Sequence, residues 1–483
     1  MKKNKMMSAS LLVSALACTG LALVGCSHGA SMPTQAEKVF QTTNFYYDTS
    51  AETAYNVSVK ISSTDSVTAV ACGKIKATDG QYGNRDGVLT LGADFMKQIT
   101  AGEKTVKVTA GSKTISLNLF AASKVVTTAQ EFQDINKNLT GYFILGNDID
   151  LSSIANFEPL GFYFTETDTN NAYFHGVLEG NGYTVKNAKS YWSDTTATNY
   201  GVYSGSGAVK FSSDAHKNGD NVGLFQVIGS SGVVRDVNFQ NINIRGRTIV
   251  GAIAGNCMGT VMNCTVDGTS KVEMGTHYYD DDCNMGGAFG IVAGSGNVSN
   301  VICQCTSQVI GATGALTVNG VQIEKAGIYL DWNNDYVGKT GNGWDHGTPE
   351  TNDNPWWKQC AVDKEYSTTA STLTGKVKDS NGSQTDGQYA FVGKCWGNVS
   401  NCVAKKFQIT PMDGTARDIC FGQTHLAANK STSGDSDLGA LTNDILLDDA
   451  GLKSASNYAS YDTSVWSIKD GSVPSLVQQY TIQ

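Results

Sequence analysis

The sequence is poor in proline and in basic residues, and each shortage narrows the class of protein. Only 6 of its 483 residues are proline, against 53 glycines. This balance favours turn-rich β structure without long proline linkers. Lysine and arginine number 35 against 44 acidic residues, which gives a net charge of −9 at pH 7. Because an acidic chain disfavours binding to phosphate backbones, we expect no nucleic-acid partner.

Complete catalytic and metal-binding signatures are also missing. The six histidines are scattered, so no Ser-His-Asp set can be assigned, and no His-Glu-x-x-His motif is present. Cys303-Gln-Cys305 lacks the wider gap that zinc knuckles use. Asp331-x-Asn333-x-Asp335 begins like a calcium loop, but Tyr336 stands where that loop needs glycine. The sequence therefore predicts no metal site and no cofactor.

The sequence does contain a short phrase that recurs four times: Gly, any residue, Val, any residue, Asn or Asp, then Val or Cys. The copies begin at Gly232, Gly259, Gly296 and Gly397, so the spacings are 27, 37 and 101 residues. A repeat of a few tens of residues indicates a solenoid or a propeller. Apolar residues mostly alternate within a copy, as in strands. Because each unit is too short for a propeller blade, we expect coils of two or three short strands, stacked as a parallel β-helix.

The last two positions of the phrase predict a turn and a core residue. Asn or Asp suits a turn because it tolerates left-handed φ and its side chain can bond its own backbone. The next residue, Val or Cys, should face the core. Four cysteines share this inward parity: Cys264, Cys303, Cys305 and Cys402. We expect them to be buried small apolar residues, although disulfides are also open to an exported chain.

Several further segments combine glycine with apolar residues. They are residues 142–151, 159–161, 174–185, 223–225, 251–255 and 465–476. Together they resemble the GLUG-motif proteins of bacterial surfaces, over roughly residues 125 to 478. The resemblance implies a right-handed, pectin-lyase-like parallel β-helix. It points to no shared reactive site, because turns and core positions define that family.

The N-terminal segment is typical of an export signal. Three lysines precede an uncharged run from residue 8 to residue 25. The run ends in Leu-Val-Gly-Cys26, which resembles the bacterial lipobox. This implies cleavage before Cys26 and acylation of that cysteine, which would hold the protein on a membrane. We therefore expect a signal peptide at 1–25, a tether at 26–37 and a location in the cell envelope, outside the cytoplasm.

The remaining segments complete an all-β fold class. Residues 38–122 alternate in short runs between turns, which is typical of a β-sandwich. The span 91–106 resembles the closing hairpin of immunoglobulin-like modules, which implies a spacer. Thr128-Ala-Gln-Glu131 is a capping box, and residues 441–452 form a second helix candidate, so short helices should cover both edges of the solenoid. The expected order is an immunoglobulin-like β-sandwich at 38–122 and a right-handed parallel β-helix with capping helices at 123–483.

An insertion of about residues 323–385 separates the third and fourth copies of the phrase. It holds four of the chain's seven tryptophans. Insertions in solenoids project from one face, often the binding face, and aromatic rings stack on sugars or anchor protein partners. The candidate ligand-binding residues are Asp331, Trp332, Asp335, Tyr336, Trp344, Asp345, Trp356 and Trp357. The alternative is a local mini-core in which the same tryptophans only hold a long loop together.

These observations favour a lipid-anchored bacterial cell-surface protein without catalysis, either an adhesin or a glycan-binding protein. Its partner would be an extracellular polysaccharide or a host or neighbouring surface protein. A polysaccharide lyase or glycoside hydrolase, acting in a groove of the β-helix, is the alternative. For that alternative, Asp280-Asp-Asp282 and Trp344-Asp-His346 match only fragments of the patterns in pectin-degrading enzymes. A purely structural envelope component is the third interpretation.

Overall fold

The computed structural model describes the chain from residue 37 to residue 480, with gaps. The described ranges are 37–161, 172–191, 221–246, 249–275, 284–310, 316–318, 321–323, 376–378, 384–386, 388–409, 417–419, 421–424 and 440–480. Strands dominate these ranges and the helices are short, so the predicted all-β class is confirmed. No helix within them is long and apolar enough to cross a membrane.

The N-terminal part consists of two sheets that share one core. One has four strands, in the order β1 (Glu37–Phe40), β3 (Asn56–Lys60), β7 (Val88–Leu91) and β6 (Tyr82–Arg85). The other has five, in the order β2 (Asn44–Asp48), β9 (Lys113–Ala122), β8 (Gly102–Ala110), β4 (Val67–Cys72) and β5 (Ile75–Lys76). Val57 and Val59 from the first sheet and Val106 and Leu117 from the second are fully buried in the same cluster. The predicted alternation of these strands is confirmed.

The span 91–106 is not a hairpin, so that prediction is wrong. Strand β7 ends at Leu91 in the four-stranded sheet, and β8 begins at Gly102 in the five-stranded one. Between them lies the short helix α1 (Ala93–Met96). Its Phe95 and Met96, with Ile99 beyond it, are buried. Their spacing suits a helical turn that crosses from one sheet to the other.

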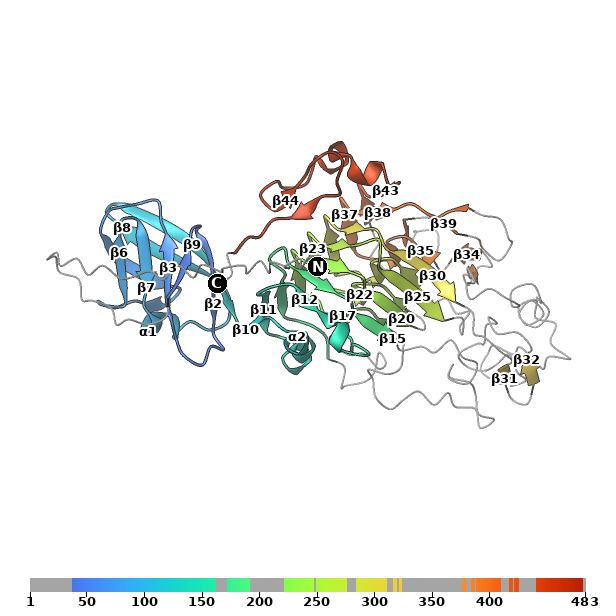
Figure 1. Ribbon diagram of the computed structural model, residues 1–483, viewed down its shortest axis with the longest axis horizontal. Coiled ribbons are helices and arrows are strands. Elements are labelled where there is room, and N and C mark those ends of the chain that lie inside the picture. The colour runs from blue at the N-terminus through green and yellow to red at the C-terminus, as the bar shows by residue number, and fades with distance from the viewer. Residues whose placement is uncertain are drawn as a thin grey trace, which may run out of the picture.

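Most of the described residues from 124 onward wind into stacked coils, which Figure 1 shows beside the two N-terminal sheets. Equivalent strands of successive coils pair in parallel and form five sheets. Sheet 1 contains β10 (Lys124–Val126), β11 (Tyr142–Leu145), β13 (Val177–Glu179), β18 (Val233–Arg235), β23 (Thr260–Met262), β28 (Asn297–Ser299), β37 (Asn398–Ser400) and β42 (Ala440–Thr442). Sheet 2 contains β12 (Ile149–Asp150), β14 (Thr184–Lys186), β19 (Asn238–Gln240), β24 (Thr265–Val266), β29 (Ile302–Cys303), β38 (Val403–Lys405) and β43 (Ile445–Leu447).

The other three sheets contain fewer strands. Sheet 3 contains β15 (Lys189–Tyr191), β20 (Asn243–Gly246), β25 (Lys271–Gly275) and β30 (Thr306–Ile310). Sheet 4 contains β16 (Asn221–Val222), β21 (Ile249–Val250), β26 (Asn284–Gly286) and β35 (Gln388–Tyr389). Sheet 5 contains β17 (Phe225–Ile228), β22 (Ala254–Cys257), β27 (Phe289–Val292), β36 (Val392–Cys395) and β41 (Gly422–Thr424).

Four short antiparallel pairs lie outside these sheets. They are β31 (Leu316–Val318) with β32 (Val321–Ile323), β33 (Lys376–Lys378) with β34 (Gln384–Asp386), β39 (Gln408–Ile409) with β40 (Arg417–Asp418), and β44 (Trp466–Ser467) with β45 (Ser475–Leu476).

A complete coil therefore has five strands, and the prediction of two or three is wrong. The coil that begins with β18 passes through β19, β20, β21 and β22 before β23 starts the next one. Each of its strands has only two to four residues. The breaks in apolar alternation that the sequence shows are the corners between these strands, because each corner resets which residues face inward.

The turn of the repeated phrase has the predicted left-handed backbone. Asp236, Asn263, Asn300, Asn401 and Asn443 have φ between 51° and 57°. Their side chains bond one another instead of their own backbone. The Nδ2 of Asn263 donates to Asp236 Oδ1 at 2.9 Å, and the Nδ2 of Asn300 donates to Asn263 Oδ1 at 3.2 Å. These turns thus form a ladder along one corner of the stack.

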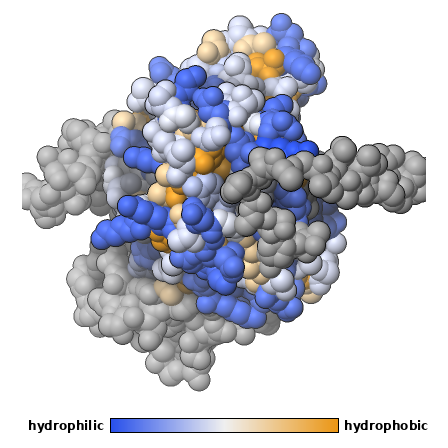
Figure 2. All heavy atoms as spheres, turned by 90° about the vertical axis from the view of Figure 1, so that its left-hand side faces the viewer, coloured by the Kyte–Doolittle hydropathy of each residue, from blue (hydrophilic) through white to orange (hydrophobic). Residues whose placement is uncertain are grey.

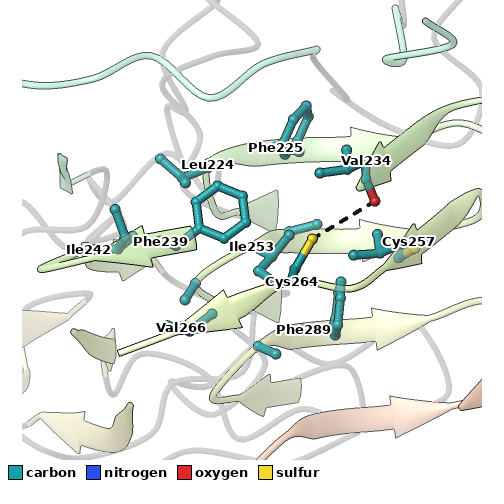
Figure 3. Packing of buried hydrophobic residues seen from close by; sticks show 14 of the residues in the cluster. Leu224, Phe225, Val234, Phe239, Ile242, Ile253, Cys257, Cys264, Val266 and Phe289 are labelled. Atoms are coloured by element: carbon teal, nitrogen blue, oxygen red, sulfur yellow. Dashed lines mark hydrogen bonds between the residues drawn. The ribbon is translucent and has the colours of Figure 1, made fainter. Parts of the chain in front are cut away.

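The inward positions of the phrase form continuous buried columns. Val234, Val261, Val298 and Val399 pair across successive coils and are fully buried. Figure 3 shows labelled side chains of this core pointing into one interior, with Cys264 Sγ 3.9 Å from the Val234 carbonyl oxygen. The four inward cysteines that the sequence singles out, Cys264, Cys303, Cys305 and Cys402, are buried free thiols, so their predicted burial is confirmed.

One of the two predicted helices is present. Thr128 caps α2 (Ala129–Gln133) through a complete capping box with Glu131, and the 3-10 turn η1 (Asp134–Lys137) follows. The predicted helix at 441–452 is wrong. Strands β42 and β43 occupy most of that range, before the 3-10 turn η7 (Gly451–Lys453). The left-handed φ of Asn443 and the pairing of Leu441 with Val399 make this segment a further copy of the repeat.

Residues 454–480 form a strap that runs back along the coils, here called the C-terminal strap. It begins at η8 (Ala455–Tyr458), contains β44 and β45, and runs from β43 toward the N-terminal sheets (Figure 1). Tyr461 Oη donates to the Asn401 carbonyl oxygen at 2.8 Å, and the amides of Gln479 and Tyr480 donate to Asn181 Oδ1. The strap therefore contacts both a late and an early coil.

Seen from the side of the two N-terminal sheets, the molecule is mainly hydrophilic, with only small groups of hydrophobic residues (Figure 2). Among the described residues Val477 of the strap is the one exposed large hydrophobic side chain, at 38%.

Candidate functional site

One corner of the coil, between sheets 3 and 4, receives insertions of very different length. The connections at this corner are residues 192–220, 247–248, 276–283 and 311–387. The strands on both sides nevertheless stay in register from coil to coil, as in the pairing of Gly275 with Ile310 before the corner and of Val250 with Met285 after it. All four connections therefore leave the stack of coils on the same side. We call this side the insertion corner.

The residues that the sequence predicts as a ligand site belong to the longest of these connections. All eight candidates, from Asp331 to Trp357, lie outside the described residues, as does the predicted lipidation residue Cys26. What the structure places is the point of departure of their segment at β30 and its return at β35. Both points are at the insertion corner.

The outer face of sheet 3 borders this corner and carries a row of interacting side chains. Tyr191, Arg245 and Glu273 occupy equivalent positions on β15, β20 and β25. The Arg245 guanidinium lies 4.4 Å from the centroid of the Tyr191 ring, and its Nε donates to Glu273 Oε2 at 2.9 Å. Lys189 Nζ lies 4.7 Å from the centroid of the same ring. Burial, then the Glu273 carboxylate, raise the pKa of Tyr191.

A second row runs beside the first on the same face. It contains Lys189, Asn243, Lys271 and Thr306, one from each strand of sheet 3. Lys189, Lys271 and Thr306 are exposed. Within the described part of the chain, neither of these lysines takes part in an ion pair. The charged side chains described on this face are thus three cations and Glu273, on a chain whose net charge is −9.

The sequence gives only a weak signal for these rows. Arg245 stands 13 residues after Gly232, whereas Glu273 stands 14 residues after Gly259. Because of this difference of one residue, the sequence does not show that Arg245 and Glu273 occupy equivalent positions; the pairing of β20 with β25 does. Tyr191 belongs to a coil without a full copy of the phrase, so counting from the repeat does not reach it.

A second charged cluster lies where the two N-terminal sheets meet the coils. Arg235 Nε donates to Glu179 Oε2 at 2.7 Å, and the same guanidinium donates to Glu103 of β8 at 2.5 Å. Burial, then the Asp236 carboxylate, raise the pKa of Glu179 to about 7, although Arg235 favours its ionised form. Burial also raises the pKa of Asp236.

Two carboxyl groups with raised pKa values are typical of acid–base sites, but also of buried ion-pair networks. Here Glu179 is 1% exposed and Asp236 6% exposed. The end of the C-terminal strap lies beside them, where the Tyr480 carbonyl oxygen accepts from Asn181 Nδ2 at 2.7 Å. A solute could not reach these carboxyl groups in this arrangement. The cluster therefore serves as the joint between the N-terminal sheets, the first coils and the strap.

No three His, Cys, Asp or Glu side chains converge as a metal site within the described ranges. The fold and the charged rows of sheet 3 define the class of this molecule: an all-β protein in which the described parallel coils present an insertion corner beside a sheet face with more basic than acidic side chains.

Comparison with known proteins adds a partial likeness. No protein-family model matches the chain. A segment of 149 residues, 29% of the chain, is 30% identical to part of halomucin from Haloquadratum walsbyi (strain DSM 16790 / HBSQ001). The match spans 1% of the length of halomucin. Such a short share identifies no family.

Proposed function

We propose that this chain is a lipid-anchored bacterial cell-surface protein that binds an extracellular ligand at its insertion corner without converting it. The observation that carries the proposal is that connections of 2 to 77 residues all leave the coils at one corner. In the coils from β18 to β37 the connections between the other sheets have only 2 to 4 residues, and variable segments on one side are typical of a recognition surface. The ligand would be an extracellular polysaccharide or a partner surface protein, as for an adhesin.

The proposal assigns a part to each region of the chain. Cys26 carries the lipid, and residues 38–122 form an immunoglobulin-like spacer. The coils form a right-handed parallel β-helix of the GLUG type, with α2 over the first edge and the C-terminal strap along one side. The two-sheet core of the N-terminal part and the parallel pairing of the coils support this division. The spacer would hold the insertion corner away from the membrane.

A replacement of the longest connection tests the recognition surface. The step from β20 to β21 takes only residues 247–248, so the same two residues, Arg-Thr, should close the gap left by deletion of 311–387. We expect this variant to melt like the wild type and to lose its ligand in a screen of glycans and surface proteins. The matched control places Arg-Thr in place of 276–283. Unchanged binding by the 311–387 replacement would refute the proposed site.

Single substitutions then separate a ligand site from a mini-core. Replacement of Trp332, Trp344 or Trp356 by alanine should weaken binding by roughly 2 kcal/mol with an unchanged melting temperature. If all three variants instead lose about 3 to 5 kcal/mol of folding stability, the tryptophans form a local core.

Two further measurements test the anchor and the absence of turnover. Cys26→Ala should release the protein from the membrane fraction, and retention there with an unacylated N-terminus would contradict the anchor. Release of reducing ends or unsaturated products from a polysaccharide panel would overturn the non-catalytic assignment in favour of a hydrolase or a lyase.

A further inference from the structure

We infer that the outer face of sheet 3 binds an acidic polysaccharide, with Lys189, Lys271 and Arg245 facing its carboxylates and Tyr191 stacking on a sugar ring. This inference rests on the proposed function, because it names the ligand chemistry of the surface that borders the insertion corner.

The charges of this face complement an anionic ligand. Lys189 and Lys271 are exposed, and both are without an ion pair in the described part of the chain. Together with Arg245 they outnumber the one carboxylate described on this face, Glu273. The whole chain carries 44 acidic against 35 basic residues, so a face with the opposite balance departs from the rest of the molecule. An anionic ligand gains most at such a face.

The spacing of the cations suits a polymer. Neighbouring strands lie about 4.8 Å apart, so Lys189 on β15 and Lys271 on β25, two strands apart, are separated by roughly 10 Å along the coil axis. Arg245 on β20 lies between them in the neighbouring row, so the three cations form a zigzag line along the coil axis. A linear polymer with evenly spaced carboxylates can follow such a line, whereas a single small anion would meet one step only.

The aromatic ring in the row suits a sugar ligand. Tyr191 is half-buried, and Lys189 Nζ and the Arg245 guanidinium lie over its ring, at 4.7 and 4.4 Å from the centroid, so a sugar that stacks there displaces one of these cations toward a carboxylate of the ligand. An aromatic ring offers a flat apolar surface to the C–H face of a sugar, and the neighbouring cations offer charge. This combination favours a uronic-acid polymer over nucleic acid, because the acidic chain as a whole repels both polyanions but repels the denser phosphate charge more strongly.

A substitution of Glu273 should strengthen binding, whereas substitutions of the two lysines should weaken it. The Glu273 carboxylate accepts a hydrogen bond from Arg245 Nε–H and so neutralises part of the positive charge of Arg245. Glu273→Gln removes the competing carboxylate and leaves an amide oxygen in place. We expect this variant to bind acidic polysaccharide about three- to ten-fold more tightly, since a like charge is removed and Arg245 becomes available.

The experiment uses the purified full chain and paired probes. The probes are polygalacturonate, alginate and hyaluronate, each beside its carboxyl-reduced form, which keeps the sugar chain and removes the charge. Affinities are measured by calorimetry at low and at moderate salt. We expect at least one acidic probe to bind, its reduced form to bind much more weakly, and the affinity to fall as salt rises.

The variants locate the binding face. Lys189→Gln and Lys271→Gln should each weaken binding by about five-fold. Lys113→Gln is the matched control, because Lys113 is an exposed lysine on β9 of the N-terminal sheets, and it should bind like the wild type. Both substitutions in sheet 3 replace exposed side chains, so the melting temperature should not change.

The outcomes separate this inference from the function on which it rests. If a neutral glycan or a surface protein binds and none of the sheet 3 variants changes its affinity, the proposed function stands and the acidic ligand is refuted. If reduced and acidic probes bind equally, charge selection is refuted. If no glycan or protein binds at all, both proposals fall.

Discussion

The C-terminal strap should depend on one side chain, that of Asn181. This residue is fully buried, and its Oδ1 accepts the amides of Gln479 at 2.8 Å and Tyr480 at 2.7 Å. Its Nδ2 donates to the Tyr480 carbonyl oxygen at 2.7 Å. Each such bond contributes about 1 kcal/mol net, so the three together stabilise the end of the strap by about 3 kcal/mol. A free-energy change of that size corresponds to roughly a hundred-fold change in the opening equilibrium.

The substitution that isolates this effect is Asn181→Gly. Asn181 has a φ of 52°, which glycine adopts readily and alanine does not. The matched control is Asn187→Gly, because Asn187 has a similar φ of 61° and its Nδ2 bonds Asp150 Oδ1 within the coils. Both substitutions raise the backbone conformational entropy of the unfolded chain by the same amount. The difference between them therefore reports the clamp on the strap.

Hydrogen exchange gives the clearest assay. In Asn181→Gly the amides of Gln479 and Tyr480 should exchange about a hundred-fold faster than in the wild type, whereas amides of the sheet 1 core should change little. Asn187→Gly should leave the strap amides as they are. Wild-type exchange at Gln479 and Tyr480 in Asn181→Gly would refute the reasoning, and so would equal loosening of the strap by both variants.

Three further predictions follow from the core and from the joint. The pKa of Glu179 in the folded protein, about 7, lies above its ordinary value of 4.5, so between these pH values the folded state keeps a proton that the unfolded chain has lost. The stability that protonated Glu179 adds is therefore complete below pH 4.5 and is lost as pH rises through 7. This loss amounts to about 3 kcal/mol. Urea midpoints at pH 5 and pH 8 should show a larger loss of stability in the wild type than in Glu179→Gln, in which Asp236 with its raised pKa remains, and an equal loss in both proteins would contradict the prediction. Val301 is fully buried, so Val301→Asp should lower the free energy of unfolding by about 3 kcal/mol or more. Val301→Cys, which places the cysteine of neighbouring coils at this position, should melt nearly like the wild type. A Val301→Asp variant as stable as the wild type would show that the inward register is wrong. Burial raises the pKa of Cys257 and Cys395 to about 12, so a thiol reagent at pH 8 should label neither until the protein is denatured, and labelling of the native protein would contradict their burial.

The parts of the fold that the sequence predicts are those that each copy of the repeat encodes locally. A left-handed turn needs Asn, Asp or Gly at one position, and a column such as Val234, Val261 and Val298 needs an apolar residue two places earlier. Both signals recur without knowledge of the neighbouring coils. The capping box at Thr128 is local in the same sense, and it too is confirmed.

The features that sequence reasoning missed depend on which coils become neighbours. The row Tyr191, Arg245 and Glu273 forms only through strand pairing, and unequal corners shift its members in the sequence. The segment 441–452 was open to a helical interpretation because its leucines fit more than one period. Pairing of β42 with β37 decides for a strand there. The clamp on Asn181 comes from a segment about 300 residues away, as Tyr480 lies far along the chain.

The insertion corner also has a consequence for how such a chain can diversify and be engineered. Each doubling of a loop's length costs only about 0.6 kcal/mol of closure entropy, and the ladder on either side pairs alike whether the corner takes 2 residues or 77. Recognition segments could therefore be exchanged at this corner by recombination while the core residues stay under constant selection. For the same reason the short turn at 247–248 is the place to graft a foreign peptide for display, beside segments that already vary in length.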